Sequence, residues 1–282
     1  MTSLVTAPAL YPSSPAAGKA ARSHVGLRLL VIAAAFVLVA VSLSAQGQQG
    51  PGGNIGALGQ QVKRPPAPTG PPPRLADGTI DLGDGTWTTR GGNLTSWLKQ
   101  GEELPLLAPA KALMESRNPS ADPYAWCLPM GVVRGNPYPI RFIQNYTHKK
   151  PTHLFIMFEL MNTFRQVFMD GRAHPPDPDP TWFGHSIGSY EGDTLVIDSI
   201  GFNEKSWFDG RGVPHTDRLH TIERWMRVDA GHMKTEVLID DPGAYSRAFT
   251  VTFESTLNPP TDELLEFVCQ ENNQYGFASG VR

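Results

Sequence analysis

The stretch "GVPHTDRLH", residues 212–220, places two histidines and an aspartate within six consecutive positions. Imidazole and carboxylate groups this close together suit proton transfer, in which a carboxylate orients a histidine that acts as a general base. The spacing H-x-D-x-x-H matches no strong zinc motif, so no metal site is predicted. The alternative is that residues 212–220 form a polar turn whose hydrogen bonds fix the loop before a strand.

Four residues are candidates for this proton-transfer chemistry: His185, Asp209, His215 and His220. Asp198 or Asp217 would serve as further orienting carboxylates. The pattern G-x-S-x-G at 184–188 also suggests a hydrolase nucleophile, but that motif needs a buried strand before its serine and a helix after it. A proline-rich run precedes this serine and a strand-like segment follows it, so we do not expect a nucleophile here.

Aromatic residues accompany the candidate histidines and acids. Trp182 and Phe183 precede His185 at the end of a proline-rich stretch, and Trp207 lies next to "FDG". A stiff loop that presents aromatic rings beside a histidine suits a lid over a cavity. We therefore predict that Trp182, Phe183 and Trp207 contact a ligand. The alternative is that these rings only plug one end of the fold.

The elements that must position these residues are strands. Segments rich in branched and aromatic residues follow one another, with tight turns such as Gly192-Asp193 ahead of the next strand. Consecutive strands joined by short turns form an antiparallel meander, which closes naturally into an up-and-down barrel. We predict an all-β, lipocalin-like barrel with irregular N-terminal segments; a β-sandwich is the alternative. Short helices are expected near 94–100 and 107–116.

Alternation along the strand after the opening motif suggests which side chains point inward. Ile222 and Met226 share one face with His220 and Arg224, whereas Glu223 lies on the other. If the aliphatic face is the interior, His220 and Arg224 point into the barrel. A buried histidine and arginine need polar partners, so they would form a polar network or the polar end of a ligand cavity.

The N-terminal region differs in composition from the rest. Residues 1–76 contain no Asp or Glu and six basic residues, which leaves 18 basic and 27 acidic residues after them. The run "LLVIAAAFVLVAV" at 29–41 is typical of a signal peptide, although an uncleaved anchor is the alternative. We predict a signal peptide or membrane anchor over 1–45, a Gly/Pro-rich linker over 46–76, and one barrel domain over 77–282.

Charge and cysteine content narrow the function classes. The folded part is acidic and its basic residues are scattered, which argues against nucleic acid as a partner. The chain has two cysteines, Cys127 and Cys269. A widely spaced pair in an exported protein favours a disulfide, and two separate buried thiols are the alternative.

Two resemblances add to this interpretation. Gly85-Thr86-Trp87 is similar to the G-x-W on the first strand of lipocalins, where the tryptophan plugs the barrel floor. The run "DGRAHPPDPDPTWFGHSIGSYEGDTLVIDSIGF" with "GVPHTDRLHTIERW", "IDDPGAY" and "EFVCQEN" resembles a group of exported bacterial proteins without an assigned activity. That resemblance covers about 125–275 and implies export. Tyr190 stands where that group usually has Trp, and the N-terminal region is unusually long.

We therefore expect a periplasmic or inner-membrane-anchored barrel that binds a small apolar or aromatic molecule, with Arg224 and His220 at the polar end of its cavity. The membrane would be contacted only through the N-terminal segment, and no cofactor is predicted. The alternative is a lyase, isomerase or hydrolase that uses a histidine general base on a small hydrophobic substrate. A purely structural envelope protein is a third possibility, in which the interior would be packed solid.

Overall fold

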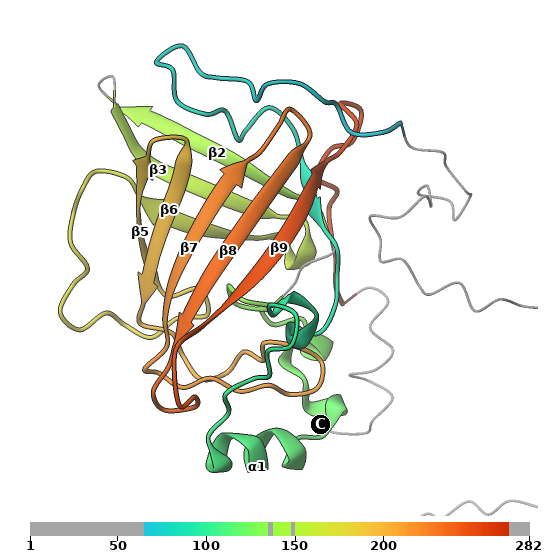
Figure 1. Ribbon diagram of the computed structural model, residues 1–282, viewed down its shortest axis with the longest axis vertical. Helices are drawn as coiled ribbons and strands as arrows, with labels where there is room; N and C mark the ends of the chain where they lie inside the picture. Colours follow the sequence, from blue (N-terminus) through green and yellow to red (C-terminus); the bar gives the residue numbers. More distant parts are fainter. Residues whose placement is uncertain (1–64, 135–137, 148–149, 271–282) are drawn as a thin grey trace, which may run out of the picture. The chain divides into compact units, whose positions relative to one another are not determined.

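The computed structural model describes residues 65–134, 138–147 and 150–270, so the signal or anchor predicted at 1–45 lies outside the described residues. Nine strands follow each other in chain order around a closed barrel, which confirms the predicted all-β barrel (Figure 1). The strands are β1 (Trp87–Thr89), β2 (Ile140–Thr147), β3 (Lys150–Phe158), β4 (Thr163–Phe168), β5 (His185–Glu191), β6 (Thr194–Ile200), β7 (His220–Arg227), β8 (His232–Asp240) and β9 (Phe249–Leu257).

One seam of the barrel departs from the antiparallel meander. β4 and β5 pair in parallel, and only through Val167↔Ser186 and Phe168↔Ile187. The connection 169–184 causes this arrangement, because it loops out beside the barrel instead of turning back as a hairpin (Figure 1). The wall therefore has a short ladder at the β4–β5 seam, and the β1–β2 ladder, with the single pair Trp87↔Ile140, is shorter still.

The first end of the barrel is closed by the residues before and within β1. Trp87 is fully buried, and its indole Nε1 donates to the carbonyl oxygen of Leu82. The Arg227 guanidinium lies 4.9 Å from the centroid of the Trp87 ring and also pairs with Asp84. The tryptophan of the G-x-W motif thus packs inside the barrel near its first strand.

Part of the segment predicted as a linker contacts this end. Of residues 46–76, the structure describes 65–76, and these lie against two hairpins of the barrel. Arg74 forms an ion pair with Asp193 in the β5–β6 turn, and the Ala230 amide donates to the Gly70 carbonyl oxygen at 3.0 Å. Residues that precede the predicted domain boundary at 77 therefore contact the barrel.

The second end is covered by short helices and by loop 201–219. Helix α1 (Ala108–Ser116) matches the helix expected near 107–116. The other helical segments are 3-10 turns: η1 (Leu94–Trp97), η2 (Pro119–Ala121), η3 (Pro123–Trp126) and η4 (Leu160–Asn162). Within the described part of the chain, no helix is long and apolar enough to cross a membrane.

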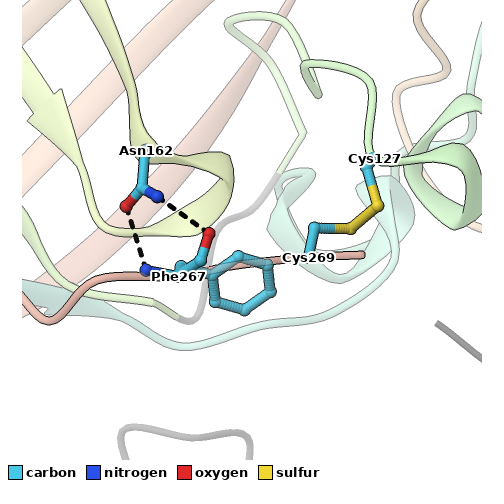
Figure 2. The surroundings of a disulfide bond; sticks show 4 residues. All are labelled: Cys127, Asn162, Phe267 and Cys269. Carbon is cyan, nitrogen blue, oxygen red and sulfur yellow. Dashed lines mark hydrogen bonds between the residues drawn. A yellow bond between two sulfur atoms is a disulfide. The ribbon is translucent and has the colours of Figure 1, made fainter. Parts of the chain in front are cut away.

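A disulfide joins the covering loop to the C-terminal segment. Cys127 and Cys269 are bonded with their Cα atoms 5.7 Å apart, which confirms the predicted pair. Asn162, in the turn after β3, both donates to the Phe267 carbonyl oxygen and accepts from its amide, each at 2.9 Å (Figure 2). The segment after β9 is thus attached at two places, to the β3–β4 turn and to the loop before β2.

Candidate functional site

The inward face of β7 is opposite to the one predicted. Glu223 is 1% exposed, whereas the Arg224 side chain is 40% exposed and pairs with Glu191 on the outer surface. The prediction that His220 and Arg224 face the lumen is therefore wrong. Trp225 shares the inward face with Glu223. Its large ring gives this face an apolar surface that a count of aliphatic residues alone overlooks.

An ion pair crosses the lumen in place of the predicted polar residues. Arg165 on β4 is 3% exposed, and its Nη2 atom lies 2.6 Å from Glu223 Oε1 on β7. The same guanidinium donates from Nε to Ser186 Oγ at 3.0 Å and from Nη2 to Ser199 Oγ at 2.6 Å. A charge removed from water needs such compensation, and here one carboxylate and two hydroxyls provide it.

Some buried polar atoms beside this pair have no hydrogen-bond partner among the described residues. They are Glu223 Oε1, Thr221 Oγ1 and Thr235 Oγ1. Glu223 Oε1 contacts Arg165 as an ion pair without the geometry of a hydrogen bond, and Glu223 Oε2 accepts from the Trp225 indole. An unpaired buried polar group costs roughly 1–3 kcal/mol, so a water or ligand that bonds to these atoms would be stabilised there.

A pocket in the lumen ends on these polar groups. Its polar lining includes Arg165, Glu223 and Thr235. The space between its walls measures about 740 Å³ with the solvent at its mouth included, and about 60 Å³ of it admits the centre of a water molecule. Its apolar lining includes Ile156, Phe158, Phe183, Trp225, Val237 and Phe253. Residues of η4 and of the 130–134 segment also line it, beside the attachment of the C-terminal segment.

Two of the four candidate catalytic residues meet on the outside of the barrel. His220 Nε2 lies 2.8 Å from Asp198 Oδ1, and His174 Nε2 lies 3.2 Å from the same oxygen. His174 Nδ1 also lies 2.8 Å from Nδ1 of His185, so His174 links His185 to Asp198. These contacts hold loop 169–184 against β5, β6 and β7.

The outer cluster favours neutral histidine at position 185. Partial burial lowers the pKa of His185 below its usual 6.5, and the nearby positive charges of His174 and Arg172 lower it further. The ring stacks on Phe168 with the centroids 5.1 Å apart. Among the described residues, no group of three or more His, Cys, Asp or Glu side chains is placed to hold a metal ion.

The other two candidates, Asp209 and His215, are buried in the loops at the second end. Asp209 accepts from the Leu94 and Arg211 amides and pairs with the Arg211 guanidinium. His215 Nδ1 faces the Thr216 carbonyl oxygen, so Nδ1 carries the proton and Nε2 accepts from the Ser206 hydroxyl at 2.7 Å. Burial lowers the pKa of His215. This geometry matches the loop-fixing alternative for the opening motif.

Of the three aromatic residues predicted to contact a ligand, one lines the lumen pocket and two do not. Phe183 lines the lumen pocket and stacks on Phe158 with the ring centroids 5.5 Å apart. Trp182 and Trp207 do not line it; Trp207 is buried with the Arg117 guanidinium 4.8 Å from its ring centroid. The residues that prediction missed are Arg165, Glu223, Thr235 and His174. A signal existed for Arg165, which lies between Phe164 and the apolar residues Val167 and Phe168 of β4, whereas Glu223 lies among other polar and charged residues of β7.

The scan against protein-family models and the searches of curated proteins and of solved structures found no match to this chain. The function is therefore argued from the chain's own geometry.

Proposed function

We propose that this barrel binds a small, mostly aromatic or apolar molecule in its lumen. The observation that carries the proposal is the lumen pocket, whose lining is mostly apolar and includes the Arg165–Glu223 ion pair and the Thr235 hydroxyl. Ligand pockets typically combine a mainly apolar lining with a few polar groups that fix orientation. The polar end is thus assigned to Arg165 and Glu223 in place of Arg224 and His220.

Aromatic side chains on several sides of the pocket would fix the orientation of the ligand. Phe183 comes from loop 169–184 and lies flat on Phe158 at one side of the pocket, while Phe253 and Trp225 approach from β9 and β7. Aromatic rings favour stacked or edge contacts with another ring at 4.5–7 Å, so a flat one-ring molecule fits this lining. Loop 169–184 therefore acts in ligand binding through Phe183.

A substitution inside the pocket tests this proposal against a matched substitution outside it. Val237 and Leu238 are neighbours on β8, and Val237 lines the lumen whereas Leu238 lines a groove on the outer surface. Titration with p-cresol and with toluene, followed by ligand-observed NMR, measures binding to each variant. Val237→Phe fills the pocket, so binding weakens by roughly tenfold or more. Leu238→Phe leaves it unchanged.

Two results contradict lumen binding. One is that neither compound binds the unmodified protein. The other is that Leu238→Phe weakens binding as much as Val237→Phe, because the ligand would then sit on the outer surface.

We also propose that the protein is exported and faces the periplasm. The apolar run at 29–41 and the Cys127–Cys269 disulfide support this, since disulfides persist in oxidising compartments. N-terminal sequencing of the protein from the periplasmic and membrane fractions of its own host separates a cleaved signal peptide from an anchor. Recovery of the reduced protein from the cytoplasm alone contradicts export.

One contact favours the enzyme alternative: His220 Nε2 lies 2.8 Å from Asp198 Oδ1, as expected for a histidine base with an orienting carboxylate. An active site would also bring at least three of His185, Asp209, His215 and His220 together at an open cavity. His185 and His220 instead join an outer cluster, and Asp209 and His215 hold loops at the second end. None of the four lines the lumen pocket.

A further inference from the structure

We propose that the lumen pocket selects a ligand whose polar end is neutral and both donates and accepts hydrogen bonds, as the hydroxyl of a phenol does. This inference rests on the proposed function, because it specifies the ligand of the same pocket. The observations that carry it are the opposite charges of Arg165 and Glu223 and the Thr235 hydroxyl, which lines the same pocket without a hydrogen-bond partner among the described residues.

The ion pair disfavours a charged polar end of either sign. Arg165 Nη2 and Glu223 Oε1 lie only 2.6 Å apart, so any group that reaches one of them is also close to the other. A ligand carboxylate attracted by the guanidinium would be repelled by the carboxylate of Glu223, and an ammonium would be repelled by Arg165. In a buried site this repulsion is weakly screened and adds to the cost of removing the ligand's charge from water.

The buried Glu223 carboxylate and Thr235 hydroxyl suit a group that both donates and accepts hydrogen bonds. Glu223 Oε1 lies 2.6 Å from Arg165 Nη2 without the geometry of a hydrogen bond, and the Thr235 hydroxyl is 1% exposed with no hydrogen-bond partner among the described residues. A phenolic hydroxyl donates to the carboxylate and accepts from the Thr235 hydroxyl or from the guanidinium. Its ring then lies among the aromatic side chains Trp225 and Phe253 of the same pocket.

A set of four ligands of similar size separates this inference from the binding function itself. p-Cresol, toluene, p-toluate and 4-methylbenzylamine share a methylphenyl body and differ in the polar end. Calorimetry and ligand-observed NMR at neutral pH measure each affinity. We expect p-cresol to bind tightest, with toluene about five- to tenfold weaker for lack of the hydrogen bonds and both ions weaker still.

The outcomes are distinguishable. If toluene binds as tightly as p-cresol, or if p-toluate or the amine binds tightest, the neutral-donor inference is overturned while lumen binding stands. If none of the four binds, lumen binding itself fails and takes this inference with it.

Two threonines supply a matched pair of variants. Thr235 and Thr221 are both buried with unpaired hydroxyls, but only Thr235 lines the pocket. Thr235→Val is close in shape and removes no hydrogen bond of the free protein, so the fold is retained. We expect it to weaken p-cresol binding about fivefold and to leave toluene binding unchanged, whereas Thr221→Val changes neither. Equal effects of the two variants on p-cresol overturn the assignment of Thr235.

Glu223→Gln tests the charge balance directly. It keeps the size of the side chain but leaves Arg165 without its carboxylate partner, so the pocket gains a net positive charge. We expect the preference between p-toluate and p-cresol to shift toward p-toluate by roughly tenfold or more. An unchanged order of affinities in a folded Glu223→Gln variant overturns the role of the ion pair. The threonine pair decides the question if this variant does not fold.

Discussion

The two faces of the barrel wall at β5, β6 and β7 carry different polar chemistry at the same level. Each strand has a polar pair of consecutive residues: His185 and Ser186, Asp198 and Ser199, His220 and Thr221. The first member of each pair points outward into the histidine–aspartate cluster, and the second points inward. The inward members lie side by side, since Ser186 pairs with Ser199 and Ser199 with Thr221.

The difference between the faces follows from water. On the outer face, ionisable groups keep partial solvent access, so the Asp198 side chain remains 37% exposed and interacts with two imidazoles. On the inner face, small hydroxyls surround one ion pair, because each buried charge must find its compensation within the protein. The outer cluster holds a loop, whereas the inner group includes buried hydroxyls without a hydrogen-bond partner among the described residues.

The largest expected effect comes from breaking the inner ion pair. Arg165→Met leaves the Glu223 carboxylate buried without its partner, which lowers the free energy of unfolding by about 3–5 kcal/mol. Adding Glu223→Leu removes the uncompensated charge and recovers most of that loss. Urea unfolding of both variants measures the two effects. A loss below about 1 kcal/mol for Arg165→Met would show that water reaches this pair and that the two faces do not differ.

Acidification tests the histidines outside the lumen, His185 in the outer cluster and His215 in the loops at the second end. The pKa of His185 and that of His215 are lowered in the folded protein, so the unfolded chain takes up protons first. The stability that these neutral histidines provide is complete above about pH 6.5 and is lost as the pH falls, by at most about 1.4 kcal/mol per pH unit for each histidine. We expect the unfolding midpoint to fall between pH 7.5 and 5.

Two substitutions identify which histidines cause the loss of stability with falling pH. His185→Gln and His215→Gln should each reduce the loss of stability with falling pH, because each removes a group whose pKa is lowered in the folded protein. If the stability of the double variant still fell with pH, other titratable groups would be responsible for the loss.

Asp198→Asn has a smaller effect, about 1 kcal/mol or less, because its histidine contacts are partly exposed and screened by salt. Salt should reduce the effect further, which unfolding at low and high ionic strength measures. Asp217→Asn, on the exposed part of the neighbouring loop, is the control. A loss of stability comparable to that of Arg165→Met would mean that the outer cluster contributes as much to the free energy of unfolding as the inner ion pair.

The smallest effect is expected at Thr221. Its hydroxyl is buried without a partner, so Thr221→Val should leave the unfolding free energy unchanged or raise it by up to about 1 kcal/mol. Thermal unfolding measures the change. A clear destabilisation would show that the hydroxyl is bonded to a resident water, as buried hydroxyls commonly are.

Sequence reasoning reached the barrel because turn signals and alternating residues repeat along the chain, and it reached the disulfide because the chain has a single pair of cysteines. It failed at the inward face of β7, where counting aliphatic residues favoured the wrong choice between two faces. The deciding facts were that Glu223 has a partner on β4 and that Trp225 fills the interior. Neither fact is encoded in the local pattern of β7, since both depend on strands brought together by folding.

His174 illustrates a second limit. It lies in the same proline-rich stretch as His185, yet its contact with Asp198 exists only because loop 169–184 folds back on the outer wall. The two histidines of residues 212–220, predicted together, lie in different surroundings. His215 is buried and fixes a loop, and His220 is half-exposed beside Asp198.

The Cys127–Cys269 bond has a topological consequence. The cross-link encloses β2 through β9, including the prominent loop 169–184, within one covalent ring of the chain. A protease that nicks this loop once therefore yields two fragments that stay joined and migrate as one species until a reductant is added.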